Sequence, residues 1–236
     1  MVNDLNESQP DWRKLDKLGL NLQAVLDLKD LPDDLLAQLK QCCNKNEEFN
    51  KLLLVGHAGK KLWEKVKYKV SQETHAIDQY SMSHVENFLQ DAVGKNNFEM
   101  IFPSTHSVGL QKLGELAGWH FASPFRVGIN NQWGSWYAYR AAALVKANWT
   151  TKIESELGSP CLNCEEKPCI GACAGDALEG EALSLNKCLD YRKLAGSRCV
   201  DRCLARMTCP VAHQHRYELE QIQYHYGRSI KFINKD

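Results

Sequence analysis

The residues best suited to chemistry in this chain are cysteines, most of which follow residue 160. The stretch PCLNCEEKPCIGACAGDAL, residues 160–178, holds four of them, and four more follow by residue 209. These eight are Cys161, Cys164, Cys169, Cys173, Cys188, Cys199, Cys203 and Cys209. Closely spaced thiols form disulfides, bind zinc or hold iron–sulfur clusters, and the cellular compartment helps to separate these possibilities.

The N-terminal sequence favours a reducing compartment. MVNDLNESQPDWRKL mixes charges and amides where a secretory signal needs an apolar run, and no stretch approaches the roughly 18 apolar residues of a membrane span. We therefore expect a cytoplasmic protein. Thiols stay reduced in the cytoplasm, so clustered cysteines are better interpreted as metal ligands than as disulfides.

The cysteine spacing resembles that of ferredoxins. CIGACAGDAL is similar to the ferredoxin turn CIxxCPxxAI, and eight thiolates match the ligand count of two cubane clusters. In two-cluster ferredoxins each run supplies three ligands to one cluster and a fourth, usually followed by proline, to the other. Cys209 precedes Pro210. The resemblance implies one [4Fe-4S] cluster on Cys161, Cys164, Cys169 and Cys209, and a second on Cys173, Cys188, Cys199 and Cys203.

Zinc is the alternative metal for these cysteines, because cysteine quartets whose first two members are separated by two residues also bind zinc in structural sites. The three-residue gap between Cys169 and Cys173 favours iron–sulfur, since zinc ribbons usually repeat C-x2-C. Six basic residues against one acid lie between Arg192 and Arg216. These basic residues could balance the negative charge of the clusters or bind an acidic electron donor. Alternatively, they could belong to a solvated loop.

The elements that must position these residues alternate between helix and strand. Residues 1–50 show helical spacing and predict one or two helices, and KLLLVGHAG, residues 51–59, predicts a buried strand turning into a helix over 60–70. SMSHVENFLQDAVG, residues 81–94, predicts a helix, and FEMIFP, residues 98–103, a strand. Residues 125–145 predict a strand, a turn at Asn130, Asn131 and Gly134, and a second apolar segment.

The character of the sequence changes after Trp149, where turns and cysteines replace periodic apolar residues. We place a domain boundary near residue 155, with a final helix in RYELEQIQYHYGRSIKFI, residues 216–233. The formal net charge of zero gives no global field that favours nucleic acid or a membrane surface as partner.

Aromatic side chains crowd the stretch SPFRVGINNQWGSWYAYRAAAL, residues 123–144. Aromatics at this density either fill a core or line a pocket for a flat cofactor. The stretch resembles the corresponding segment of CblC-type cobalamin-processing proteins and of cobalamin-dependent epoxyqueuosine reductases, where it borders the corrinoid site. The resemblance implies corrinoid contacts at the matching positions, which are Gly134, Ser135, Trp136, Tyr137, Tyr139 and Arg140. The neighbouring Trp133 is a further candidate contact with the cofactor.

The whole chain from about His75 onward is similar to bacterial CblC-like proteins with a C-terminal ferredoxin module, through HAIDQY, the aromatic stretch, the cysteine motifs and RYELEQIQYH. This resemblance implies an α+β fold: a flavin-reductase-like or nitroreductase-like domain over 1–155, followed by a small ferredoxin-like domain over 156–236. Asp78 is the candidate catalytic acid, with a helix cap as its alternative role. Among the histidines, His120 is the first candidate for a contact with the cofactor, and the alternative is an ordinary surface or core histidine.

We therefore predict an iron–sulfur protein that transfers electrons from two [4Fe-4S] clusters to a corrinoid, or alternatively a flavin, bound by the N-terminal domain. As an enzyme it would be a cobalamin-linked oxidoreductase. Its expected partners are a low-potential electron donor, such as a reductase or flavodoxin, and a small-molecule or corrinoid substrate. The alternatives are a ferredoxin-type carrier that docks on a partner enzyme and a zinc-stabilised interaction module.

Overall fold

The computed structural model describes residues 9–43, 49–70, 75–103, 108–154, 158–179 and 183–233. The chain divides into two compact units. The first unit is Met1–His120 with Tyr137–Glu156, and the second unit is Phe121–Trp136 with Leu157–Asp236. Within the described ranges, none of the helices combines the length and apolar character needed to cross a lipid bilayer.

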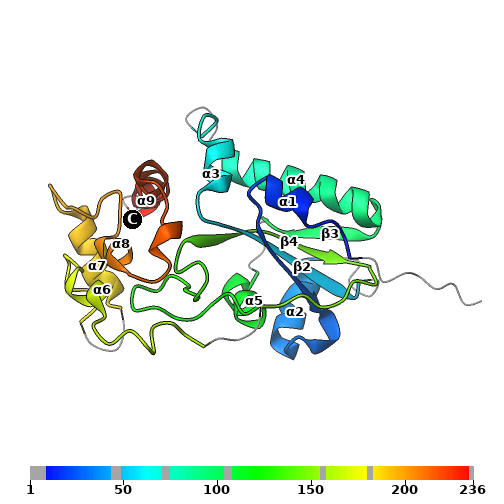
Figure 1. Ribbon diagram of the computed structural model, residues 1–236, viewed down its shortest axis with the longest axis horizontal. Helices are drawn as coiled ribbons and strands as arrows, with labels where there is room; N and C mark the ends of the chain where they lie inside the picture. Colours follow the sequence, from blue (N-terminus) through cyan, green and yellow to red (C-terminus); the bar gives the residue numbers. More distant parts are fainter. Residues whose placement is uncertain are drawn as a thin grey trace, which may run out of the picture. The chain divides into compact units, whose positions relative to one another are not determined.

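The first unit is built on a four-stranded antiparallel sheet in the order β1-β2-β4-β3 (Figure 1). Its strands are β1 Leu22–Asp27, β2 Lys51–Ala58, β3 Phe98–Phe102 and β4 Tyr137–Val145. Every residue of the central strand β2 is buried, as expected for a strand that is covered on both faces. Its register with β4 pairs Lys51 with Val145 and shifts at a bulge between Val55 and Gly56.

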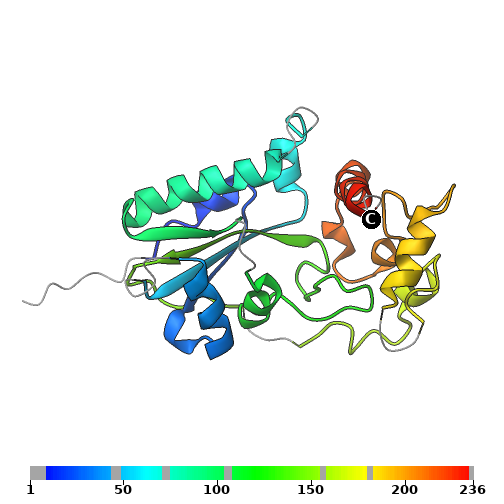
Figure 2. The same ribbon diagram turned by 180° about the vertical axis from the view of Figure 1, so that it is seen from behind.

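Helices lie on both faces of this sheet. The long helix α4, Ala76–Val93, packs on β3 and β4, beside α1, Arg13–Lys17, and α3, Lys61–Val66. In both views α2, Asp33–Gln41, and α5, Leu110–Leu116, lie on the opposite side of the sheet from α4 (Figures 1 and 2). A short 3-10 helix, η1, spans Leu28–Asp30.

Local sequence explains where these helices begin and end. Pro32 immediately precedes α2, whose first turn carries Asp33 and Asp34 at the positive end of the helix dipole. Gly94 ends α4 with a φ of 86°, in the region that favours glycine. The expected strands at 51–58 and 98–102 and the expected helix before Gly94 are present, although that helix starts at Ala76 rather than at residue 81.

Two sequence-based expectations of secondary structure missed part of the fold. Residues 1–50 were expected to form one or two helices, and α1 and α2 are present, but Leu22–Asp27 between them forms β1, in which the first five residues are all buried. A strand buried on both faces lacks the alternating pattern and is hard to distinguish from a short buried helix. A strand was expected from Phe125 up to the turn at Asn130, whereas the segment 121–136 forms turns joined only by the isolated bridges Phe121–Ile129 and Asn130–Gly134 among the described residues.

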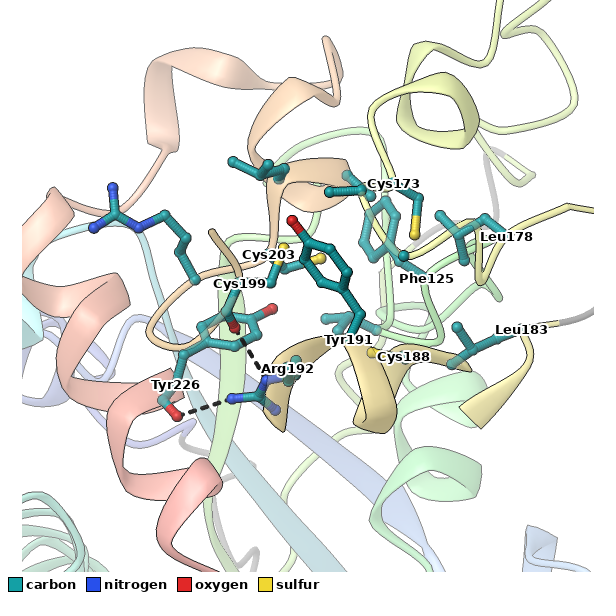
Figure 3. A pocket seen from close by; sticks show the side chains of 16 residues that line it. Phe125, Cys173, Leu178, Leu183, Cys188, Tyr191, Arg192, Cys199, Cys203 and Tyr226 are labelled. Carbon is teal, nitrogen blue, oxygen red and sulfur yellow. Dashed lines mark hydrogen bonds between the residues drawn. The ribbon is translucent and has the colours of Figure 1, made fainter. Parts of the chain in front are cut away.

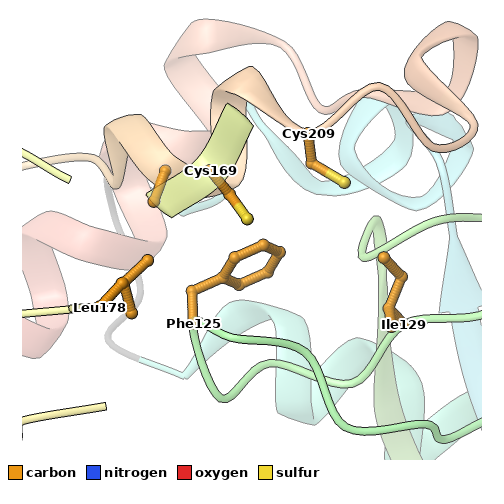
Figure 4. Close-up of a cluster of buried hydrophobic side chains, with 6 residues drawn as sticks. Phe125, Ile129, Cys169, Leu178 and Cys209 are labelled. Carbon is orange, nitrogen blue, oxygen red and sulfur yellow. The ribbon is translucent and has the colours of Figure 1, made fainter. Parts of the chain in front are cut away.

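The second unit consists of short helices joined by turns. Its helices are α6 Pro168–Gly171, α7 Leu185–Lys193, α8 Leu204–Thr208, the 3-10 helix η3 His213–His215 and the terminal helix α9 Leu219–Ile233. The expected C-terminal helix is therefore present. A buried cluster at its centre contains two cysteines among apolar side chains (Figure 4); its members are Phe125, Ile129, Cys169, Leu178, Ala205 and Cys209.

The segment 121–136 contributes two of these core residues, Phe125 and Ile129. Its Trp133 ring lies 4.4 Å from the ring of His215. These contacts explain why the segment belongs to the second unit, whereas the sequence-based division kept 1–155 together. The expected boundary between residues 155 and 156 lies outside the described residues.

Candidate metal centres

Short helices carry or flank the cysteines of the second unit. Pro168 occupies the first turn of α6, where its missing N–H costs nothing, and Cys169 follows it. Ser184 caps α7, which carries Cys188, by accepting a hydrogen bond from the backbone N–H of Lys187 at 3.4 Å. Contact between α6 and α8 brings together segments that are about forty residues apart in the sequence.

Two serines hold the backbone of the cysteine loops. The hydroxyl of Ser159 accepts a hydrogen bond from the Cys161 N–H at 3.3 Å, and that of Ser197 accepts one from the Cys199 N–H at 3.2 Å. Both sites read S-x-C in the sequence, and a serine that bonds the amide two residues later forms a local turn. The same device thus fixes one loop of each predicted ligand set.

The first quartet, which we define as Cys161, Cys164, Cys169 and Cys209, is gathered in one place. Burial raises the pKa of the Cys169 thiol, and the neighbouring thiols of Cys209, Cys161 and Cys164 raise it further. Cys169 and Cys209 are both buried and lie on one side of the Phe125 ring (Figure 4). An open hollow of about 410 Å³ borders Cys164 on the outside.

The second quartet, which we define as Cys173, Cys188, Cys199 and Cys203, surrounds a single cavity of about 180 Å³ (Figure 3). Burial raises the pKa of the Cys203 thiol; the Arg206 amide opposes this rise, and the thiols of Cys199 and Cys188 add to it. The backbone N–H of Ala177 donates to the sulfur of Cys173 at 3.4 Å. Four thiols from well-separated positions therefore meet around one hollow.

The rest of this cavity is mostly apolar. Phe125, Leu178, Leu183 and Tyr191 contribute to its wall together with the partly buried Tyr226, and desolvation raises the pKa of Tyr226 to about 12. Such a wall excludes water and lowers the local dielectric, which tunes the potential of a redox group.

The cysteine-rich second unit is consistent with iron–sulfur binding. Among the residues that the structure describes, no group of three or more His, Cys, Asp or Glu side chains converges on a single metal ion. A tetrahedral zinc ion requires four sulfurs at about 2.3 Å from one point. The second quartet lines a hollow of about 180 Å³ with thiols, and thiolates are ligands both of iron–sulfur clusters and of zinc.

Four residues expected at a corrinoid site lie in the second unit. Ser135 and Trp136 are fully buried, and Arg206 bonds Ser135 and stacks on Trp136. A Cβ on Gly134 would meet the carbonyl oxygen of Val211 at 2.4 Å, while Trp133 packs on η3. Gly134, Ser135 and Trp136 are thus buried and each contacts residues of its own unit.

The other four lie in the first unit, on β4 and at the end of the turn after α5. The Tyr139 hydroxyl lies 3.3 Å from Nδ1 of His120, and burial raises the pKa of Tyr139. The Tyr137 ring meets the Tyr139 ring edge-on at 6.0 Å between centroids. Arg140 Nε donates to Nδ1 of the buried His57 at 2.9 Å. The corrinoid assignment of these residues stays a prediction.

Asp78 is not a helix cap. It lies in the first turn of α4, whose N-cap is His75, and its carboxylate is about half exposed. One carboxylate oxygen is 3.7 Å from Nη1 of Arg140, and the other is 3.9 Å from Nδ1 of His75. Asp78 therefore lies beside Arg140 and His75 at the start of α4; its catalytic role stays a prediction.

Sequence reasoning missed two buried arginines and His57. Arg192 and Arg206 belong to the basic run between 192 and 216, but both are buried. The signal for Arg192 was its spacing, since it follows Cys188 by one helical turn. His57 lies in the all-buried strand β2, where a polar residue needs a partner.

Comparison with solved structures places the fold near epoxyqueuosine reductases. The enzyme from Bacillus subtilis aligns with a TM-score of 0.57 at 13% identity over 88% of this chain, and that from Streptococcus thermophilus with 0.52 at 15% over 85%. An epoxyqueuosine reductase with an epoxyqueuosine-modified tRNA stem loop aligns with a TM-score of 0.58 at 13% over 90%.

This chain spans 65% of the length of the Bacillus subtilis enzyme and 64% of that from Streptococcus thermophilus. No protein-family model and no curated protein matches it. At this identity the likeness establishes a shared α+β fold alone. The cysteine-rich C-terminal region is a property of this chain's own sequence.

Proposed function

We propose that this chain is an iron–sulfur redox protein in which the first and second quartets each hold a [4Fe-4S] cluster. The observation that carries the proposal is the cavity of about 180 Å³ that has Cys173, Cys188, Cys199 and Cys203 in its wall. When bound, such clusters supply one-electron transfer.

The chain's own residues prepare these sites. Burial disfavours the thiolate form of Cys161, Cys169 and Cys209 in the first quartet, so loading must displace protons and offset that desolvation. Backbone N–H groups near the sulfurs, such as that of Ala177, stabilise negative charge there. The apolar wall around the second quartet keeps water away from the cavity.

The finer proposal is that the first unit, as a flavin-reductase-like or nitroreductase-like domain, binds a corrinoid that accepts the electrons. The sequence resemblance and the likeness to epoxyqueuosine reductase folds support it. Because Trp133, Gly134, Ser135 and Trp136 belong to the second unit, the candidate contacts within the first unit are His120, Tyr137, Tyr139 and Arg140. A low-potential reductase or flavodoxin is the proposed electron donor.

The first test is analysis of protein purified without oxygen, by visible absorption and by measurement of iron, acid-labile sulfide, zinc and cobalt. Two clusters predict about eight iron and eight sulfide per chain. Zinc without sulfide would refute the redox proposal and leave a zinc-stabilised module.

Variants then locate the ligands. Cys203→Ala in the second quartet should remove about four iron per chain, and Cys209→Ala in the first quartet should do the same. Cys42→Ser is the matched control, because Cys42 lies in the first unit at the end of α2, and it should keep all the iron. Equal iron in all three variants would contradict the ligand assignment.

Binding of the acceptor needs its own experiment. Hydroxocobalamin and, separately, FMN are titrated into the iron-loaded chain, and reduction of each is followed spectroscopically with a low-potential donor. Binding and reduction of cobalamin support the corrinoid proposal, and those of FMN would replace it with the flavin alternative. Reducible clusters without either ligand would identify a ferredoxin-type carrier.

A further inference from the structure

Arg192 shares one face of α7 with a cysteine of the second quartet. It follows Cys188 by four residues, which places both side chains on the same side of the helix. Both line the cavity of about 180 Å³, together with the other three cysteines of that quartet (Figure 3). Arg192 is only 9% exposed, so its charge is held at the wall of this cavity and away from bulk water.

Neutral oxygen atoms surround the Arg192 guanidinium. Its Nε donates to the carbonyl of Cys199 at 3.1 Å, and its Nη2 lies within donating distance of three further oxygens. These are the carbonyl of Val200 at 3.2 Å, the carbonyl of Tyr226 at 3.1 Å and the hydroxyl of Ser229 at 3.0 Å. The guanidinium carbon also lies 5.6 Å from the centre of the Tyr226 ring.

No carboxylate among the described residues pairs with this charge. Within the described ranges, none of the ion pairs includes Arg192. The other arginine in the cavity wall, Arg202, is different, because its Nε lies 2.7 Å from a carboxylate oxygen of Asp201. A buried cation is costly without a counter-charge, even when its hydrogen bonds are satisfied.

The predicted cluster of the second quartet would supply a negative counter-charge to Arg192. Four thiolates and the cluster that they hold carry net negative charge, and the second quartet lies in the same cavity wall. Adding an electron makes the cluster more negative, so a nearby buried cation favours the reduced state.

We propose that Arg192 is the built-in counter-charge of the second quartet and raises the reduction potential of the cluster held there. The proposal rests on the proposed function. In this role Arg192 is a positioning residue: it acts on the cluster through its charge and steadies the Cys199 loop through its hydrogen bonds. Its side chain also ties that loop to α9 through Tyr226 and Ser229.

The test is a redox titration of the iron-loaded chain followed by electron paramagnetic resonance. Arg192→Gln should lower one of the two midpoint potentials, changing that reduction equilibrium about tenfold, or about 59 mV for a one-electron step. Arg192→Lys keeps the charge and should retain most of the potential. The matched control is Lys193→Gln, because Lys193 is the next residue of α7 but is exposed, so solvent screens its charge.

Unchanged potentials in a fully loaded Arg192→Gln variant would overturn the inference while leaving the clusters in place. If Arg192→Gln loses about four iron but Arg192→Lys keeps them, the charge requirement is supported by loading itself. If both variants lose that iron equally, the geometry of the guanidinium matters and the counter-charge role is refuted. Wild-type chain without iron and sulfide would refute the proposed function instead.

Discussion

The guanidinium carbon of Arg206 lies 4.6 Å from the centre of the Trp136 ring, within the second unit. Arg206 Nε also donates to the Ser135 hydroxyl at 3.3 Å, and Nη2 donates to the Ser135 carbonyl. Arg206 is on α8, between Cys203 and Cys209, whereas Trp136 ends the segment 121–136. One buried side chain therefore joins that segment to the cysteine region.

Arg206→Ala should therefore destabilise the second unit by about 2–4 kcal/mol, through lost hydrogen bonds and a lost buried cation–π contact. Urea unfolding followed by the near-ultraviolet signal of the tryptophans measures the change. Arg198→Ala is the control, because Arg198 is exposed, and it should cost less than about 0.5 kcal/mol. An equal decrease in the free energy of unfolding in the two variants would mean that the buried contacts of Arg206 do not stabilise the second unit.

The serines before the cysteine loops give a second prediction. Ser159→Ala and Ser197→Ala each remove an acceptor from a cysteine N–H, at 3.3 Å and 3.2 Å respectively, and should weaken their loops by about 1 kcal/mol. Iron release to a chelator should then be about fivefold faster, because about 1 kcal/mol is a factor of about five. Ser83→Ala, at an exposed position of α4, should leave the rate unchanged. Unaltered release in both loop variants would contradict the prediction.

His120 gives a prediction on pH. Burial lowers its pKa, so in acid the unfolded chain takes up a proton before the folded chain does. The stability contribution is therefore complete above the unfolded pKa of about 6.5 and is lost as pH falls toward the folded pKa. Hydrogen exchange of β4 amides between pH 5 and 8 should show opening free energies that rise with pH, and His120→Gln should flatten that rise.

His84 must be treated together with His120. Burial lowers the pKa of His84 as well, and Lys69 adds to this effect, so part of the slope should survive in His120→Gln. Adding His84→Gln should remove more of it. A slope that neither substitution alters would show that other groups control the acid sensitivity of the first unit.

The sequence carried most information where local spacing determines structure. Cys188 and Arg192 lie four residues apart on one helix, so their side chains share a face. The sequence gaps among Cys161, Cys164 and Cys169 are short, so these thiols lie near one another independently of the rest of the fold. The strands 51–58 and 98–102 were predictable for the same reason, since each is a short apolar run bounded by turn residues.

Long-range packing could not be predicted in the same way. Nothing local in FRVGIN indicates that Phe125 and Ile129 pack with Cys169 and Cys209 rather than on a sheet. Likewise, LQAVLD becomes β1 only because β2 is there to pair with it, from Leu22 opposite Gly56 to Asp27 opposite Lys51. Such tertiary contacts override the local pattern.

Gly134 gives the last prediction, since it combines a positive φ of 58° with a close approach to Val211. An added Cβ would lie 2.4 Å from the Val211 carbonyl oxygen, so backbone must move in Gly134→Ala. Gly158→Ala is the matched control: its φ is 74°, but an added Cβ there meets nothing within 4 Å. It should cost only the left-handed strain of about 1–2 kcal/mol.

The difference between these two variants isolates the clash. We expect Gly134→Ala to cost at least about 2 kcal/mol more than Gly158→Ala in urea unfolding. Because Val211 follows Cys209 by two residues, displacing it should also disturb the first quartet, so Gly134→Ala alone should lose part of its iron. Equal stability and equal iron in the two variants would show that the segment 121–136 does not support the cysteine loop.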